Sequence, residues 1–376
     1  MMTSNRTLGI YVHIPFCLCK CLYCDFCSYT EQDGGVHSEY ADAVIREIRQ
    51  YAERARDYTV TSVYFGGGTP TLMPTTELSR ILSAIGQSFA LSPAAEITLE
   101  ANPKTVDAEQ MTALRQIGFN RISIGVQSLC NSELLALGRL HTAEEAIETL
   151  TLAMRHFPRV SADLMYGIPE QTAESFERTL LRTLDTGVTH LSLYGLILEE
   201  GTPLYQRRTH LTLPDEETEY AMYLRAAEIL SARGFSHYEI SNYAKRGKEC
   251  QHNLRYWRAQ EYMGFGIAAH SYFGGVRYGN GQDLSTYLKS EIFAPKVSET
   301  LSDADLRFEY IMLALRLAEG IEELDHRRRF DTDFWQTHRA SLQKYVEGGY
   351  LKRENGRVFL SDAGMYIENA ILADIL

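Results

Sequence analysis

Strand-like and helix-like segments alternate along the first 235 residues of this 376-residue chain. Six apolar segments, each followed by one with helical periodicity, recur at intervals of roughly 30 residues, the size of a strand–helix–strand unit. Parallel strands joined by helices need cover on both faces, so the chain must form a barrel or a doubly wound sheet. We predict strands at 8–16, 61–67, 95–102, 121–129, 159–167 and 190–198, with helices at 38–56, 75–89, 107–117, 131–155, 173–187 and 215–233.

Chemically distinctive residues follow the C-terminal end of every predicted strand, beginning with a cysteine-rich loop and a "GGGTP" sequence. The next four strands end near Glu100, Gln127, Asp163 and Tyr194. A barrel gathers all such positions into one ring, whereas a doubly wound sheet brings together only those near its switch point. We therefore predict an α/β fold, a partial (β/α)6 barrel of the TIM type with its functional residues on the C-terminal rim.

The rest of the chain divides into two parts. Residues 236–296 are rich in Gly, Tyr and His and lack clear periodicity, which predicts a connecting segment lying against the barrel. In residues 297–376, helical patterns precede two short strands around an "ENG" turn and a final helix, the outline of a small winged-helix-like α/β domain. The basic sequence "DHRRRF" at 325–330 raises nucleic-acid binding, but the net charge of −12 favours a domain packed on the barrel.

The sequence contains neither a recognisable secretion signal nor a membrane span. Its start, "MMTSNRTLGIYVHIPF", lacks a basic segment followed by an apolar one, and no run of 18 apolar residues occurs. We therefore expect a cytoplasmic protein. In that reducing compartment, clustered cysteines indicate metal binding or catalysis more than disulfides.

Five of the seven cysteines lie within "PFCLCKCLYCDFCS" at 15–28. Cys17, Cys21 and Cys24 are spaced C-x3-C-x2-C, which suits three thiolate ligands of an iron–sulfur cluster and leaves a fourth iron open. Structural zinc usually takes four ligands in two pairs, and no second pair follows. The set that ends at Cys27 is spaced C-x2-C-x2-C, so spacing alone leaves the choice of ligands open.

The sequences "YVHIPFCLCKCLYCDF" and "GGGTP" together resemble the radical S-adenosylmethionine superfamily, in particular its coproporphyrinogen-oxidase-like branch. The resemblance implies that the C-x3-C-x2-C cysteines bind a [4Fe–4S] cluster, whose open iron is chelated by the amine and carboxylate of S-adenosylmethionine. The other two thiols of this stretch, Cys19 and Cys27, fall outside the family pattern. The resemblance assigns nine further positions to S-adenosylmethionine: Tyr11, Tyr23, Gly67, Gly68, Thr69, Glu100, Gln127, Arg139 and Asp163.

The residue types at these positions suit that cofactor. Adjacent glycines let a backbone approach a ligand closely, so the "GGGTP" sequence can contact its amino-acid end. Glu100 offers an acceptor to the ammonium, and Arg139 offers a bidentate guanidinium to the carboxylate. Gln127 and Asp163 offer hydrogen-bond partners to the ribose hydroxyls.

Three features distinguish the branches of this family. The coproporphyrinogen III dehydrogenases carry C-x3-C-x2-C-x-C, but here Phe26 takes the last position and the thiol follows one residue later at Cys27. Those enzymes also have an N-terminal extension, which we do not expect here because the cysteine motif begins almost at once. The sequence "HNLRYW" at 252–257 matches the HNxxYW motif of the related haem chaperones, the HemW family, and "GFGIAAHSY" at 264–272 also resembles that group.

The resemblance thus implies a chaperone that binds haem and delivers it to apo-haemoproteins, respiratory and membrane-associated ones among them. Imidazole is a common axial ligand of haem iron and aromatic rings pack on the macrocycle, so we take His252, Tyr256 and Trp257 as the candidate haem residues. Cys250 is an alternative thiolate ligand, and we rank His270 below His252.

Two other activities stay open on this scaffold. One is the oxygen-independent oxidation of coproporphyrinogen III in haem biosynthesis, which the displaced thiol of Cys27 argues against. The other is a different radical reaction, such as methyl transfer. A fold does not decide among them, because the same barrel supports several activities.

Overall fold

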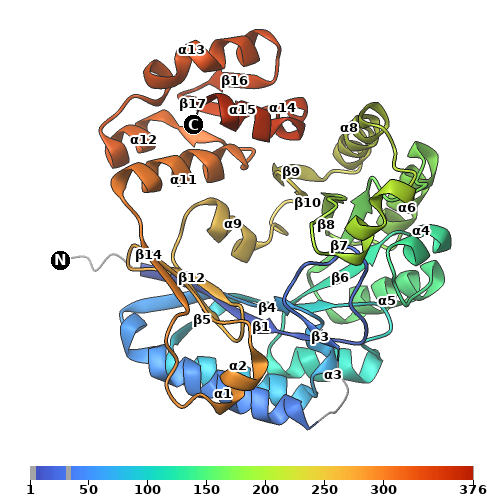
Figure 1. Cartoon of the computed structure of the whole chain (residues 1–376), viewed down its shortest axis with the longest axis vertical. Coiled ribbons are helices and arrows are strands. Elements are labelled where there is room, and N and C mark those ends of the chain that lie inside the picture. Colours follow the sequence, from blue (N-terminus) through green and yellow to red (C-terminus); the bar gives the residue numbers. More distant parts are fainter. Residues whose placement is uncertain (1–5, 31–34, 376) are drawn as a thin grey trace.

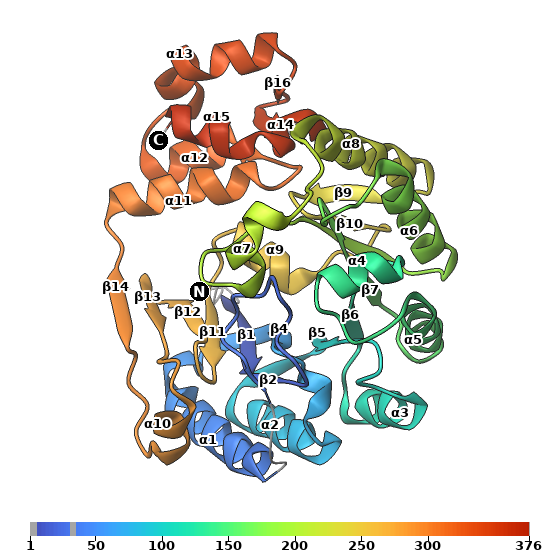
Figure 2. The same cartoon turned by 45° about the vertical axis from the view of Figure 1, so that its right-hand side comes forward.

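The computed structural model describes residues 6–30 and 35–375. A 12-stranded sheet forms the body of the protein, and a small domain built from the last 75 or so residues lies beyond one end of it (Figure 1). Helices of the first half of the chain, α1, α2, α3, α5 and α6, pack around the outside of the curved sheet (Figure 2).

Six parallel strands make up the middle of the sheet and lie side by side in chain order. A doubly wound sheet would reverse its order at a switch point, so this winding is that of a barrel. Within the described residues the sheet stays open, because its two outermost strands do not pair. The predicted partial barrel is confirmed. Its strands are β1 (Arg6–Ile14), β4 (Tyr58–Gly67), β5 (Ala90–Ala101), β6 (Arg121–Gln127), β7 (Val160–Tyr166) and β8 (His190–Gly195).

The helices between these strands begin at local sequence signals. Asp107, Thr142 and Thr172 each accept a hydrogen bond from the backbone three residues later, in a capping box that starts α3, α5 and α6. The helices of this part are α1 (Val36–Tyr51), α2 (Thr75–Ser88), α3 (Ala108–Ile117), α4 (Asn131–Ala136), α5 (Ala143–His156), α6 (Ala173–Asp185), α7 (Pro203–Gln206) and α8 (Glu216–Ala232).

Residues 236–296 contain more regular structure than their composition predicted. They add strands to both edges of the sheet, two antiparallel strands beyond β8 and a parallel strand beyond β1 that continues into antiparallel ones. These strands are short, and pairing with an existing edge, rather than intrinsic propensity, stabilises them. They are β9 (Ser236–Glu239), β10 (Asn242–Ala244), β11 (Tyr262–Phe265), β12 (His270–Phe273) and β13 (Val276–Gly279), with helices α9 (Gln251–Trp257) and α10 (Leu284–Lys289) and the later edge strand β14 (Val297–Thr300).

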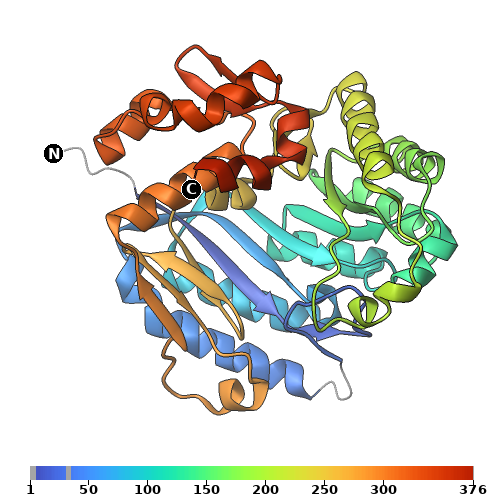
Figure 3. The ribbon, with the colours of Figure 1, turned by 45° about the horizontal axis from the view of Figure 1, so that its top comes forward.

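The C-terminal domain has its own hydrophobic core, which includes Leu315, Phe334 and Val358. Helix α9 lies between this domain and the sheet (Figures 1 and 3). The "ENG" turn takes the expected conformation, since Asn355 and Gly356 both have positive φ (52° and 75°). Its elements are α11 (Asp303–Leu315), β15 (Ile321–Glu322), α12 (Glu323–Phe330), α13 (Phe334–Glu347), β16 (Leu351–Glu354), β17 (Arg357–Leu360), α14 (Asp362–Tyr366) and α15 (Glu368–Ile375).

The basic "DHRRRF" sequence lies on α12, a helix that the sequence did not predict. Arg328 and Arg329 form ion pairs with Glu322 (3.9 Å) and Asp325 (2.7 Å), and Arg327 pairs with Asp333. These positive charges are therefore offset within the domain. Among the described helices, each is too short or too polar to cross a bilayer.

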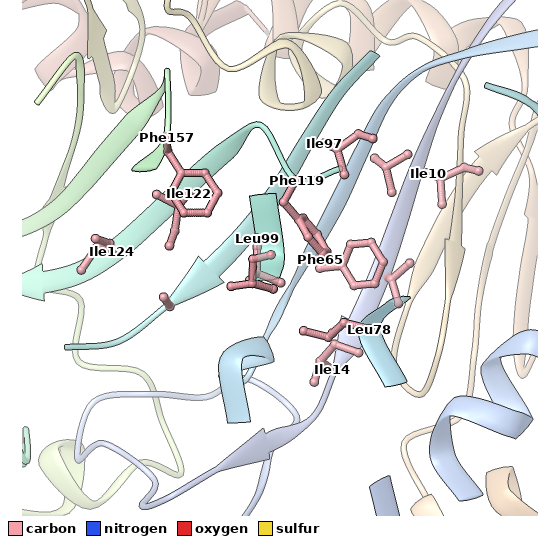
Figure 4. Close-up of a cluster of buried hydrophobic side chains, with 14 of the residues drawn as sticks. Ile10, Ile14, Phe65, Leu78, Ile97, Leu99, Phe119, Ile122, Ile124 and Phe157 are labelled. Carbon is pink, nitrogen blue, oxygen red and sulfur yellow. The ribbon is translucent and has the colours of Figure 1, made fainter. Parts of the chain in front are cut away.

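The main core lies between the sheet and the helices outside it (Figure 4). Ile10 of β1, Phe65 of β4 and Leu99 of β5 are completely buried, and the Phe65 ring meets the edge of Phe119 at 5.1 Å between centroids. Each such side chain contributes roughly 1.5–3 kcal/mol through the removal of apolar surface from water. This core fixes the positions of the strand ends that carry the polar residues.

We expect Ile10→Ala to lower the free energy of unfolding by about 2–5 kcal/mol, because it leaves a cavity in the centre of the sheet. Ile292→Ala is the matched control, since that side chain is 81% exposed and its loss should change stability by less than about 0.5 kcal/mol. Urea unfolding followed by circular dichroism measures both. Equal effects of the two substitutions would contradict this placement of the core.

Candidate functional site

Two neighbouring cavities open at the C-terminal ends of the parallel strands. The cysteine cavity, of about 360 Å³, is lined by the cysteine loop and by residues of β5, β6 and β7. The aromatic cavity, of about 670 Å³, is lined largely by tyrosine and histidine side chains and by parts of 252–282. Phe26, Gly67, Glu100 and Tyr194 line both cavities, so the two adjoin along this group.

The cysteine loop is held at both ends and in its middle. Phe16 and Cys17 form a short strand, β2 (Phe16–Cys17), which pairs in parallel with β3 (Tyr29–Thr30) and closes the loop. Within the loop, the Leu22 N–H donates to the Leu137 carbonyl (3.0 Å), and the Leu22 carbonyl accepts from the N–H of Leu204 (2.8 Å). The loop is thus clamped between α4 and α7.

Cys17, Cys19, Cys21 and Cys24 all line the cysteine cavity, and Cys19 is the exposed one among these four. The Cys17 sulfur lies 3.7 Å from the Thr69 hydroxyl, and the Cys21 sulfur accepts a hydrogen bond from Arg139 (3.3 Å). Burial raises the pKa of Cys17 and of Cys24, so these thiols are neutral until a bound metal draws off the proton.

The donor set fits an iron–sulfur cluster. Within the described ranges, no three His, Cys, Asp or Glu side chains converge as ligands of one metal ion would. A cluster differs in this respect because each thiolate binds a different iron, so its ligands face a shared cavity from separate positions. Lys20 and Arg139 also line the cavity, and their positive charges partly offset the negative charge of thiolate ligands. Cys27 lines the aromatic cavity instead.

The triple glycine packs against the strand that carries the cysteine loop. Gly67 has a φ of 109°, a conformation that favours glycine, and a Cβ atom there would overlap the His13 ring. A Cβ atom on Gly68 would lie 2.7 Å from the Phe16 carbonyl oxygen. The Gly68 N–H donates to the Ile14 carbonyl (2.8 Å). Both predicted glycines line the cysteine cavity, and close packing with the loop also requires them.

Asn102 is a central residue of the site that the sequence reasoning missed. Its amide nitrogen donates to Thr69 (2.8 Å), and its amide oxygen accepts from Arg139. Arg139 also donates to the Gly125 carbonyl (2.6 Å), while its Nε is buried without a hydrogen-bond partner and remains available to a ligand. Asn102 stands two residues after Glu100 in "LEANP", which was the available signal. Thr69 supports Asn102 and Cys17 and does not line the cysteine cavity.

Glu100 lies between the two cavities. It accepts hydrogen bonds from the Tyr64 hydroxyl (2.7 Å) and the Gly67 N–H (3.1 Å). Burial first, and then the charge of Asp163, raise its pKa to about 7. Asp163 accepts from Ser123 (3.1 Å), and burial raises its pKa as well. A cation beside Glu100 would stabilise the ionised carboxylate.

Gln127 and Tyr23 also line the cysteine cavity. Gln127 has a positive φ of 65° and follows an irregularity in the register between β6 and β7. Such a conformation costs about 1–3 kcal/mol for a non-glycine residue and often marks a functional position. Tyr23 packs with Leu137 and Met165 beneath the loop.

Tyr11 lines the aromatic cavity and not the cysteine cavity. Its ring stacks with the rings of Tyr64 and His252, at 6.3 Å and 6.5 Å between ring centroids. Its hydroxyl lies 3.0 Å from His13 Nδ1. Among the nine positions assigned to S-adenosylmethionine, Tyr11 and Thr69 are thus the two that the cysteine cavity does not include.

The HNxxYW motif occupies α9. His252 and Tyr256 line the aromatic cavity, but the His252 ring is 1% exposed. Its Nδ1 lies 3.0 Å from the Ser62 hydroxyl and its Nε2 lies 2.9 Å from the Tyr256 hydroxyl. Burial lowers the His252 pKa to about 3, so the imidazole is neutral. Both ring nitrogens are engaged within the protein.

The other two residues considered for haem lie elsewhere. Trp257 lines neither cavity, and the Arg316 guanidinium lies 5.4 Å above its ring, at the contact with the C-terminal domain. Cys250 is 1% exposed, also lines neither cavity, and burial raises its pKa to about 12. A buried thiol of this kind is poorly suited to bind a ligand in either cavity.

The C-terminal domain contributes one wall of the aromatic cavity. Glu309 and Leu313, both on α11, line it. Glu309 forms an ion pair with Arg277 of β13 (2.6 Å), which joins the wall to the sheet. The aromatic cavity therefore lies between the barrel and this domain.

Comparison with known proteins places the chain in a family. Residues 11–182 match the Radical SAM superfamily, and residues 301–367 match the HemN C-terminal domain. The solved coproporphyrinogen III oxidase HemN from Escherichia coli has the same fold, with a TM-score of 0.86 over 99% of this chain and 90% of that one at 22% identity.

Several relatives at higher identity carry the name heme chaperone HemW. The chain is 38% identical to the heme chaperone HemW of Synechocystis, over 83% of this chain and 78% of that protein. It is 33% identical to the heme chaperone HemW of Escherichia coli K12, over 96% and 98% of the two chains. The mitochondrial radical S-adenosyl methionine domain-containing protein 1 of Danio rerio is 32% identical over 98% and 86%. The chain therefore belongs to the HemW family of the radical S-adenosylmethionine superfamily, and membership of that superfamily implies a [4Fe–4S] cluster and S-adenosylmethionine.

Proposed function

We propose that this protein is a haem chaperone, which binds haem in the aromatic cavity and passes it to apo-haemoproteins in the cytoplasm or at the membrane surface. The observation that carries the proposal is the aromatic cavity itself. Its volume of about 670 Å³ is that of a ligand site, and six tyrosine side chains line it. The names of the relatives support the same ligand.

The lining of the aromatic cavity suits an amphipathic macrocycle. Tyr11, Tyr64, Tyr256 and Tyr262 offer ring faces and edges for stacking on a porphyrin. The guanidinium of Arg277 also lines the cavity; it is ion-paired with Glu309 (2.6 Å), and a propionate carboxylate would have to share or replace that partner. Aromatic surface for the macrocycle and a guanidinium for a propionate suit a haem, which carries its charges along one edge, while three carboxylates, Asp25, Glu100 and Glu309, also line the cavity.

We propose that Cys17, Cys21 and Cys24 are the ligands of the [4Fe–4S] cluster. All three line the cysteine cavity, whereas Cys27, the competing third ligand, lines the aromatic cavity. When bound, cluster and S-adenosylmethionine together supply reductive cleavage of the sulfonium, and the protein positions them.

The residues around the cysteine cavity then bind S-adenosylmethionine. Glu100 accepts from its ammonium, and the free Nε of Arg139 donates to its carboxylate. Gln127 and Asp163 bind the ribose. The walls of the same cavity also include Gly67, Gly68 and Tyr23. Thr69 acts indirectly, because it positions Asn102 and Cys17. Tyr11 reaches the cofactor from the aromatic cavity, past the shared Glu100.

The adjoining cavities suggest how cofactor and haem communicate. Glu100 lines both, so the charge it presents to the aromatic cavity depends on what its carboxylate binds on the other side. An ammonium there would neutralise a buried negative charge beside the haem. Occupation of the cysteine cavity would in this way favour haem uptake.

Cluster-loaded protein should take up one equivalent of haem and should leave coproporphyrinogen III unchanged. The physical reason is that the aromatic cavity accommodates one macrocycle, and the family relationship is to chaperones. Anaerobic reconstitution, followed by a spectroscopic haem titration and a parallel assay of coproporphyrinogen turnover, measures both. Turnover of coproporphyrinogen would overturn the proposal, and so would a failure to bind haem.

Replacement of Cys17, Cys21 or Cys24 by Ala should each abolish the four-iron absorption, because the cluster loses a thiolate that no other side chain replaces. Cys19→Ala and Cys27→Ala are the matched controls and should retain it. Iron and sulfide counts after anaerobic reconstitution, with the electron paramagnetic resonance of the reduced protein, provide the measurement. A full cluster after any one of the first three changes would refute this ligand set.

The affinity for S-adenosylmethionine should fall by about eightfold between pH 7.5 and pH 6. Glu100 has a pKa of about 7, so acid protonates its carboxylate and removes the partner of the ammonium. Glu100→Gln should weaken binding at pH 7.5 and abolish most of this pH dependence. Glu109→Gln, on an exposed side chain of α3, is the control. Calorimetric titration of cluster-loaded protein with S-adenosylmethionine measures these affinities. If Glu100→Gln had the same pH dependence as the wild type, Glu100 would not be the partner of the ammonium.

A further inference from the structure

We propose that His270, and not His252 of the HNxxYW motif, ligates the iron of a haem bound in the aromatic cavity. This inference rests on the proposed haem-binding function and names the residue through which it acts. Three histidines line the cavity within the described part of the chain: His13, His252 and His270. An axial ligand needs a ring nitrogen with a free lone pair that faces the cavity.

His13 and His252 do not meet that requirement. The His13 ring nitrogens lie 3.0 Å from the Tyr11 hydroxyl and 2.8 Å from the Cys27 carbonyl oxygen. The His252 nitrogens are engaged by Ser62 and Tyr256, as described above. Either ring would have to break a buried hydrogen bond to bind iron and would leave its partner unsatisfied, which costs about 1–3 kcal/mol. Their hydrogen bonds instead hold the cavity wall together.

The His270 ring is free to bind. It is exposed, and within the described residues its nitrogens have no hydrogen-bond partner. His270 is the first residue of β12, and Tyr272 lies two residues later on the same face of the strand. Both side chains line the aromatic cavity, so the strand aims this face toward the ligand.

A glycine opposite makes room for this ring. His270 pairs with Gly279 of β13, and a Cβ atom on Gly279 would lie 2.8 Å from ring Cε1 and 2.9 Å from Nδ1. Any larger residue would push the imidazole out of its place. Gly279 does not have a positive φ, so its backbone conformation does not require glycine. The absence of a side chain at Gly279 instead leaves space for the His270 ring.

The backbone before His270 is held under strain. Ala268 has a φ of 54° and itself lines the cavity. The turn is fixed by Asn280, whose backbone N–H donates to the Ala269 carbonyl (2.9 Å) and whose side chain donates to the Gly266 carbonyl (2.8 Å). Buried Glu47 accepts from the Gly266 N–H (2.9 Å). Strain that several contacts maintain is typical of a residue held in place for function.

The surroundings of His270 complete a haem site. Tyr262 and Tyr272 pair across β11 and β12 and offer aromatic surface beside it. Arg277 pairs with Tyr272 across β12 and β13, which places its guanidinium, ion-paired with Glu309, at the same wall. Cys27 also lines the cavity and carries a possible donor atom, and its thiol donates weakly to the Gln282 carbonyl (3.8 Å).

The test is the ligation state of ferric haem added to cluster-loaded full-length protein, read by electron paramagnetic resonance and magnetic circular dichroism. Wild type should show an imidazole-ligated iron. His270→Ala should lose that signature and weaken haem affinity by about tenfold or more, and free imidazole should restore the signal. Gly279→Ala, which keeps the imidazole but displaces it, should alter the signal too.

His252→Gln and Cys27→Ser should each retain the imidazole signature, because neither removes the ligand. Circular dichroism and the cluster content of each variant establish that it is folded. If wild type binds haem but His270→Ala gives the unchanged spectrum, or if Cys27→Ser or His252→Gln abolishes the signature in a folded protein, the inference is wrong while haem binding stands. If wild type binds no haem at all, the proposed function itself fails.

Discussion

The pairing of β1 with β4 is the interaction on which the rest of the site depends. Its register sets His13 against Gly66 and Ile14 against Gly67, so the cysteine loop and the triple glycine leave the sheet side by side. The Gly67 backbone can lie there only because it has no side chain to meet the His13 ring. Parallel strands in chain order then bring the ends of β5, β6 and β7 to the same rim.

Two side chains of one short sequence, "LEANP", connect the parts of this rim. Glu100 links the β4 strand end to the space shared by the cavities through Tyr64 and Gly67. Asn102 links Thr69, behind the cysteine loop, to Arg139. In a buried polar network each member is held by the others, and an unmatched donor such as Arg139 Nε marks the place where a ligand is needed. The chemistry of the cysteine cavity therefore depends on residues contributed by five parallel strands, β4 to β8.

The HNxxYW motif joins three parts of the fold. His252 and Tyr256 bond to each other and to Ser62 of β4, and thereby attach α9 to the barrel. Trp257 extends the same helix to the C-terminal domain, where Arg316 covers it. The motif thus builds and seals the wall of the aromatic cavity. In the proposed haem site, iron ligation therefore falls to His270, whose ring is free of such bonds.

The alternation of strands and helices and the cysteine spacing were readable from the sequence, because they depend on residues close together in the chain. The partial barrel, the "ENG" turn and the positions of Glu100, Gln127 and Asp163 on one rim followed from that periodicity. The edge strands β11 to β13, the role of Asn102 and the engagement of the His252 ring depended on the tertiary structure. These features arise from contacts between segments more than a hundred residues apart, or from hydrogen bonds whose partners no local pattern specifies. Sequence determined which chemical groups the protein carries, and only the packing of the sheet decided which of them are free to act.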